Sequence, residues 1–275
     1  MSEKFAAFLR DGYCVFENML DAPMLERMRT LAQGQIDRIS PEHMAAQRAT
    51  GTLVHSNDMP EFAELLAYPK ALQTLEQHGI HDCAMWKANF ISKPPGGPQL
   101  YWHHDGNMWQ DPRSYQAMPP AIFLMYYFVD TTRHNGCLRV LPGTHRKRHP
   151  IHDMGTAHEG AINSMENPDD PRFGEFAGEV DVPVKAGDLV VGDSRMLHAA
   201  HANASEAWRS LITIWYFPEF SGLQEPSRRW VHDQFHRLHD AWPAQALDKV
   251  ATVTPRYHGN AEPLKVQRTP GPLLV

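Results

Sequence analysis

The chain has 275 residues, and 26 lysines and arginines against 32 acidic residues give it a formal net charge of −6. This acidic balance, with no run of like charges, argues against a protein that binds nucleic acid through its phosphates. Its three cysteines show no CxxC spacing, which excludes a disulfide scaffold and a thiolate zinc site and fits a reducing compartment. Without an apolar stretch of 18 residues or a signal peptide, we expect a cytoplasmic protein with no membrane span. The 17 histidines point toward metal or acid–base chemistry.

Helical patterns dominate the first 82 residues. Ser2 and Asp21 are suitable N-caps because each stands just before apolar residues at helical spacing, and Gly12 is suited to end the first helix. The expected elements are a helix over residues 3–10, a strand over 13–16, a longer helix from residue 22 to about residue 39, and short helices near 61–67 and 70–79.

From about residue 83 the pattern changes to short apolar runs separated by Pro, Gly and Asn. Strands are expected over residues 83–91, 99–105, 121–129, 137–141, 188–193 and 210–217. Many short strands with few helices between them favour an antiparallel sandwich or jelly roll, in a mainly β fold with flanking helices.

We expect one domain over residues 1–275. Residues 1–82 would form a mainly helical flank, residues 83–217 the β core, and residues 218–275 a C-terminal helix and tail. The acidic stretch at about 151–180 has little periodicity and is too long for an ordinary loop, so it is interpreted as a mobile lid or insertion.

The segment LYWHHDG at residues 100–106 carries the clearest chemical signal. Residues two apart on a strand share a face, so His103 and Asp105 point toward one place while His104 points the other way. His198 supplies a second histidine further along. Two histidines and one carboxylate form the facial triad of non-haem Fe(II) oxygenases, which leaves open positions for a co-substrate and dioxygen.

Arg209 lies eleven residues after His198, at the start of the expected strand 210–217. An inward guanidinium there can hold a carboxylate through two parallel hydrogen bonds. That arrangement suits the far carboxylate of 2-oxoglutarate, whose keto-acid end would chelate iron.

On these residues the sequence resembles the phytanoyl-CoA dioxygenase family of Fe(II)/2-oxoglutarate-dependent oxygenases. The resemblance covers roughly residues 3–217. The segments that carry it, besides the triad and Arg209, are FLRDGY at 8–13, KPPG at 93–96, NGCLRVLPGTH at 135–145 and GD at 187–188. The family pattern places the second histidine five residues before an Asn and eleven before the Arg, which selects His198 rather than His201.

The resemblance implies a double-stranded β-helix (cupin-like jelly roll) fold, with iron held by His103, Asp105 and His198 and 2-oxoglutarate held by Arg209. It also places Asn89 at a 2-oxoglutarate contact and Met125 where a relative has an aromatic cofactor contact. Residues two apart on the same expected strands extend these faces. Tyr127 therefore joins the expected cofactor pocket with Met125, and Lys87 faces inward with Asn89.

The implied activity is hydroxylation of a C–H bond, in which 2-oxoglutarate and dioxygen yield succinate and CO2. Asp105 favours hydroxylation, because halogenating relatives lack this carboxylate. Aromatic and polar residues near the metal ligands suggest a small polar or anionic substrate. We also expect a monomer or homodimer that binds neither nucleic acid nor a membrane. The expected substrate contacts are Lys87, Trp102, His104, Asn107 and Trp109.

Two other functions fit parts of the pattern. A zinc hydrolase could use the same two histidines and aspartate, but it needs a nearby general base and has no use for a buried arginine. A β-sandwich binding protein without catalysis could share the fold, although the intact set of ligands argues against it.

Overall fold

The computed structural model describes residues 2–155 and 160–275 of the chain, and in these ranges ten strands form two antiparallel sheets. The larger sheet has the order β1-β8-β5-β10-β3-β2. Its strands are β1 (Tyr13–Phe16), β2 (Val54–His55), β3 (Ala84–Lys93), β5 (Ile122–Tyr127), β8 (Leu189–Asp193) and β10 (Arg209–Phe217). The smaller sheet has the order β4-β9-β6-β7. Its strands are β4 (Leu100–His103), β6 (Leu138–Val140), β7 (Val180–Val182) and β9 (His198–Ala200).

The two faces of the larger sheet pack against different parts of the protein. β10 is buried along its whole length, and its side chains alternate between the two faces. Ile212 and Ile214 join the apolar cluster beneath the helices, whereas Leu211 and Trp215 belong to the cluster that faces the smaller sheet. The space between the two sheets is therefore an inner cavity of a jelly roll, as the sequence predicts.

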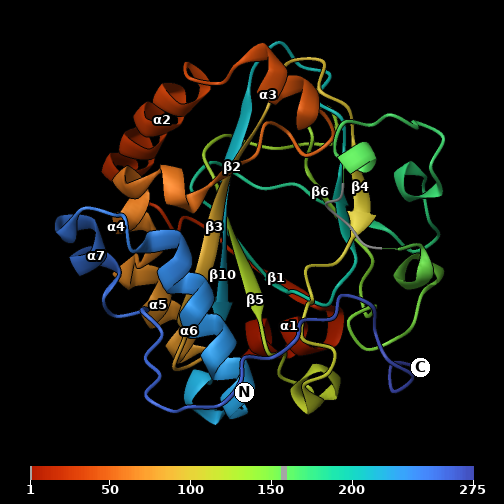
Figure 1. Ribbon diagram of the computed structural model, residues 1–275. Helices are drawn as coiled ribbons and strands as arrows, with labels where there is room; N and C mark the ends of the chain where they lie inside the picture. The colour runs from red at the N-terminus through yellow and green to blue at the C-terminus, as the bar shows by residue number, and fades with distance from the viewer. Residues whose placement is uncertain (1, 156–159) are drawn as a thin grey trace.

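Helices cover the outer face of the larger sheet. Figure 1 shows α2, α4, α5, α6 and α7 on one side of this sheet and the smaller sheet on the other. Their bounds, with the remaining helices, are α1 (Glu3–Asp11), α2 (Ala22–Ile36), α3 (Pro41–Ala46), α4 (Ala63–Leu66), α5 (Pro69–Gln77), α6 (Glu225–His239) and α7 (Ala244–Val250). None of the helices in the described ranges is long and apolar enough to cross a membrane.

Helix ends follow the capping residues that the sequence indicates. The Ser2 side chain accepts a hydrogen bond from the Phe5 amide, and Asp21 accepts one from the Met24 amide. Gly12 ends α1 at φ 90°, a left-handed conformation that glycine adopts without strain. The predicted helices and strands are all present, apart from shifts at their ends.

The structure adds elements that the periodicity does not show. The strands β2, β7 and β9 have two or three residues each, too few for a recognisable alternation, and α3 and α7 are also short. The expected boundary at residue 82 is not a boundary of the sheet, because β1 and β2 come from the helical flank and form its two edges.

The predicted insertion at 151–180 packs against the smaller sheet, and its Asn163 lines the inner cavity and accepts a hydrogen bond of 2.8 Å from the Tyr101 hydroxyl. Its Phe173 ring meets Tyr101, and its Phe176 ring meets Trp102, at centroid distances of 6.0 and 6.1 Å. Residues 156–159 lie outside the described ranges. That this segment closes over the cavity stays a prediction.

We expect Gly192→Ala to destabilise the fold. Gly192 on β8 lies opposite Phe123 on β5, and a Cβ atom at residue 192 would lie 2.0 Å from the Phe123 ring. Because Phe123 in turn packs on His198, with ring centroids 5.0 Å apart, it has little room to move. Such overpacking costs about 1–3 kcal/mol of unfolding free energy, measurable by denaturant titration.

Gly34→Ala is the matched control, since a Cβ atom there, in α2, meets nothing within 4 Å. This change should leave the stability equal or raise it by about 0.5–1 kcal/mol. Equal unfolding free energies for Gly192→Ala and the unmodified protein would contradict the packing described.

Candidate metal centre

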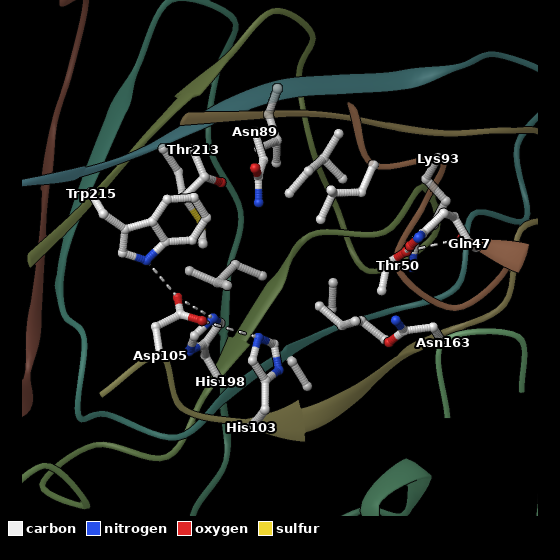
Figure 2. A pocket seen from close by; sticks show the side chains of 18 of the residues that line it. Gln47, Thr50, Asn89, Lys93, His103, Asp105, Asn163, His198, Thr213 and Trp215 are labelled. Carbon is white, nitrogen blue, oxygen red and sulfur yellow. Dashed lines mark hydrogen bonds and ion pairs between the residues drawn. The ribbon is translucent and has the colours of Figure 1, made fainter. Parts of the chain in front are cut away.

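Three possible metal ligands meet at the inner face of the smaller sheet. β4 pairs with β9 so that His103 lies opposite His198, and Asp105 follows two residues after β4. His103 Nε2 lies 3.8 Å from Asp105 Oδ1, and His198 Nε2 lies 3.7 Å from Asp105 Oδ2. Figure 2 shows the three side chains converging on one point at the floor of the cavity. They are buried, and their ligand atoms all lie within 4.8 Å of one another.

Hydrogen bonds outside the triad fix how each ligand points. His103 Nδ1 lies 3.0 Å from the carbonyl oxygen of Tyr101, and His198 Nδ1 lies 3.1 Å from that of Met196. A ring that donates from Nδ1 presents the lone pair of Nε2, so both imidazoles are set to bind a cation at the centre. Asp105 Oδ2 accepts a hydrogen bond of 2.9 Å from the Trp215 indole. The donor set of two imidazole nitrogens and one carboxylate suits iron.

The triad opens into a cavity of about 280 Å³ between the two sheets. Inward residues of β3, β5 and β10 form the opposite wall. The cavity also receives side chains from the segment before β2, from the insertion at 151–180 and from the C-terminal tail. Besides the triad, the lining includes Gln47, Thr50, His55, Trp86, Lys87, Asn89, Ile91, Lys93, Met125, Tyr127, Asn163, Ala200, Arg209, Leu211, Thr213, Trp215 and Arg268.

Two cations lie at one end of this cavity. Arg209 and Lys93 are opposite each other in the β10–β3 pairing and are 3% and 1% exposed. Lys93 Nζ donates to the carbonyl oxygens of Pro98 and His201 at 2.7 and 2.8 Å. Burial lowers the pKa of Lys93 well below its usual range, and the positive charge of Arg209 adds to the lowering.

The guanidinium of Arg209 has no hydrogen bond or ion pair to any of the described residues, and its buried Nε atom is left without an acceptor. Burial lowers its pKa, although arginine stays protonated. A buried cation without an anion is costly, so the site favours a carboxylate in front of Arg209.

The middle of the wall is polar. Asn89 Oδ1 accepts a hydrogen bond from His55 Nδ1 at 3.0 Å, and Figure 2 shows the amide nitrogen pointing into the cavity. Thr213, opposite Asn89 in the pairing, has a buried hydroxyl with no hydrogen-bond partner among the described residues. Met125 and Tyr127, on the neighbouring strand β5, line the cavity, and Tyr127 Oη lies 3.7 Å from the Met125 sulfur.

Sequence reasoning missed several of these residues. Thr213 and Trp215 could have been found, because they alternate with Arg209 on the expected strand. Lys93 was missed because the predicted strand stops at residue 91, whereas β3 continues to residue 93. Arg268 follows no local pattern that relates it to the metal ligands.

Of the five predicted substrate contacts, only Lys87 lines the cavity. Trp102 does not line the cavity and instead joins an apolar cluster with Leu141 and Ile151. Its indole donates to the Gly174 carbonyl at 3.0 Å, and its ring packs on Phe176. The prediction of a substrate contact at Trp102 is therefore corrected to a packing role.

The other three predicted contacts lie behind the metal ligands. His104 is half-buried between Trp109 and His152, with ring centroids 5.7 and 5.4 Å away. This burial lowers the pKa of His104 to about 3, so its ring is neutral. Asn107 accepts a hydrogen bond at its carbonyl from the Gln267 amide. His104, Asn107 and Trp109 hold the loop after Asp105 rather than facing the cavity.

His201 takes no part in the triad. Its Nε2 atom pairs with Asp181 at 2.6 Å. With Cys137 these residues form the one other group of potential metal ligands in the described ranges. Burial raises the pKa of the Cys137 thiol to about 11, so the thiol is protonated at neutral pH.

Comparison with known proteins gives one family and a consistent set of relatives. The family model of phytanoyl-CoA dioxygenase (PhyH) matches residues 8–211. An ectoine dioxygenase from Sphingopyxis alaskensis is 25% identical over 240 residues, which cover 80% of this chain and 77% of that protein.

Two solved structures extend the comparison to the fold. The epimerase SnoN, in complex with Fe3+, alpha ketoglutarate and nogalamycin RO, aligns with a TM-score of 0.59 at 20% identity over 97% of this chain and 96% of its own. EctD from S. alaskensis, with 2-oxoglutarate and 5-hydroxyectoine, aligns with a TM-score of 0.58 at 19% identity. The alignment covers 82% of this chain and 78% of EctD. These likenesses confirm the predicted fold.

We expect Trp215→Phe to weaken metal binding. The change keeps an aromatic ring but removes the indole N–H that holds the Asp105 carboxylate. Loss of such an outer hydrogen bond lowers metal affinity by about 10–100-fold, which anaerobic Fe(II) titration measures. Trp230→Phe is the control, because Trp230 packs on Trp86 and makes no contact with Asp105. Equal Fe(II) affinities for the two variants would contradict the role given to Trp215.

Proposed function

Because this chain belongs to the phytanoyl-CoA dioxygenase (PhyH) family of Fe(II)/2-oxoglutarate-dependent oxygenases, we propose that it hydroxylates a C–H bond of a small polar or anionic metabolite. The chain is a 2-oxoglutarate-dependent dioxygenase that uses iron, 2-oxoglutarate and dioxygen. The hydroxylation, the substrate class and the roles of individual residues are the proposal. One relative, from S. alaskensis, is an ectoine dioxygenase, and this relative supports a small-molecule substrate for the present chain.

His103, Asp105 and His198 would hold the iron. Together with 2-oxoglutarate and dioxygen, the iron supplies the oxidising power for the C–H bond, and succinate and CO2 are the co-products. The protein contributes the orientation of the three ligands and a cavity whose buried walls exclude water. The carboxylate of Asp105 favours hydroxylation, because it occupies the position that halogenating relatives leave open for chloride.

Arg209 would bind the far carboxylate of 2-oxoglutarate. The observation that carries this assignment is the buried guanidinium, which has no acidic partner in residues 2–155 and 160–275 and lies in the same cavity as the triad. Two parallel hydrogen bonds from Arg209 would fix the orientation of the co-substrate. The inward amide of Asn89 and the hydroxyl of Thr213 offer donors to its other end, with Met125 and Tyr127 as apolar walls.

The two alternatives are set aside. A zinc hydrolase needs a general base beside the metal, yet the lining of the cavity has no carboxylate other than Asp105 within the described ranges. A binding protein without catalysis would have no need for three buried metal ligands that converge beside the cavity, whereas a dioxygenase requires them. Family membership also favours the dioxygenase over both.

The metal assignment predicts a visible signal. Fe(II) and 2-oxoglutarate added to the protein without oxygen should give a charge-transfer band, which zinc does not produce. With oxygen, 2-oxoglutarate should be converted slowly to succinate. His103→Ala should remove the band and lower succinate formation more than tenfold, because one of three metal ligands is lost.

His104→Asn is the matched control for His103→Ala, since His104 neighbours the ligand but points behind it. It should keep the band, provided that its thermal unfolding curve shows a folded protein. A loss smaller than tenfold in folded His103→Ala would contradict the assignment.

A second test concerns Arg209. Arg209→Met should raise the KM for 2-oxoglutarate at least about tenfold, because the charged hydrogen bonds to the far carboxylate are lost. The same variant should lose most of its preference for 2-oxoglutarate over 2-oxovalerate, which lacks that carboxylate. Succinate and CO2 release measure the two reactions. If Arg209→Met kept the full preference for 2-oxoglutarate over 2-oxovalerate, the far carboxylate would not bind at Arg209 and the assignment would be contradicted.

A further inference from the structure

The last residues of the chain return to the metal centre. After α7 the chain continues in extended and turn conformations, and Gln267 forms a β-bridge with Met108, three residues after Asp105. The Gln267 amide donates to the Asn107 carbonyl at 2.9 Å. Further on, the Gly271 amide donates to Tyr115 Oη at 3.0 Å, and the Gly271 carbonyl accepts from Arg148. The tail is therefore held on both sides of residue 268.

Arg268 projects from this tail into the cavity. It lines the main cavity together with the triad and also the small pocket beside His104. It is half-buried, and no hydrogen bond or ion pair joins it to any of the described residues. The tail thus places near the metal centre a positive charge that no acid in the described part of the chain neutralises. This residue lies outside the segment 8–211 that the family model matches.

Lys87 supplies a second unpaired cation at the same end. Its Nζ atom lies 4.4 Å from the Trp86 ring and 4.8 Å from the Trp215 ring. The ring faces stabilise the charge but accept no ordinary hydrogen bond, so the ammonium N–H groups have no acceptor among the described residues. Desolvation lowers the pKa of Lys87 to about 8, and the charge of Arg268 adds to the lowering.

This end of the cavity presents donors without acceptors. Trp86 has a buried indole N–H that lacks a hydrogen-bond partner among the described residues, in addition to the two cations. The one acid that faces Lys87 is Asp105, a proposed metal ligand whose Oδ2 already accepts from Trp215. An oxyanion placed between Lys87 and Arg268 would satisfy these donors and remove the cost of two close cations.

We propose that Lys87 and Arg268 bind an oxyanion group of the substrate, a carboxylate, sulfate or phosphate. The proposal rests on the proposed function and names its substrate class. Trp215 contacts both Lys87 and Asp105, so the oxyanion would lie beside the metal centre, and the carbon that reacts would lie within a few bonds of it. Arg209 is at the other end of the β10–β3 pairing, which keeps the co-substrate and the substrate anion apart.

The test uses the full chain with Fe(II) and 2-oxoglutarate bound and without oxygen, so that Arg209 and the metal centre are occupied. Sodium sulfate and sodium acetate are titrated separately at constant ionic strength, and the fluorescence of the tryptophans reports binding. At least one of the two anions should give a saturable change. Arg268→Gln and Lys87→Met should each weaken that binding about tenfold or more, because each removes a charged donor.

Lys265→Gln is the matched control. Lys265 lies in the same tail but is exposed and does not line the cavity, so its removal changes the net charge as Arg268→Gln does. The control should bind the anion within twofold of the unmodified protein. No saturable change with either anion, or binding within twofold in Arg268→Gln or Lys87→Met, would overturn this inference. Absence of the charge-transfer band before any anion is added would overturn the proposed function itself.

Discussion

The antiparallel pairing of β10 with β3 positions most of the side chains that the proposed chemistry uses. Residues opposite each other in such a pairing point to the same face, so Arg209 with Lys93, Thr213 with Asn89, and Trp215 with Lys87 all face the inner cavity. From position 209 to position 215 the strand advances about 20 Å, given its usual rise per residue. One strand pair thus carries both the end that suits 2-oxoglutarate and the end that suits the substrate anion.

Trp215 connects this pairing to the metal centre on the smaller sheet. Its indole N–H holds Asp105, and its ring lies against Lys87. The orientation of a metal ligand and the position of the proposed anion site therefore depend on one side chain. Arg209 is separate from this arrangement, so binding of the co-substrate can be changed by mutation without altering the ligands of the metal. The C-terminal tail adds Arg268, whose charge acts on Lys87, to the proposed anion site.

The sequence predicts the site residues on regular strands better than those that come from loops and from the C-terminal tail. Regular strands allow His103 and Asp105, or Arg209 and the residues two apart from it, to be placed on one face from periodicity alone. The loop after Asp105 has no such period, so proximity in the chain suggested that Trp109 contacts the substrate, whereas it packs behind the ligands. Arg268 reaches the cavity through hydrogen bonds of the tail to distant loops, and no local pattern predicts such contacts.

A crystal structure of the protein grown without oxygen, with Fe(II) and 2-oxoglutarate, tests the central claim most directly. The account predicts one iron bound by His103 Nε2, His198 Nε2 and a carboxylate oxygen of Asp105, with the far carboxylate of 2-oxoglutarate against Arg209. Iron bound instead at Cys137, Asp181 and His201, or 2-oxoglutarate held by Lys87 and Arg268, would contradict it.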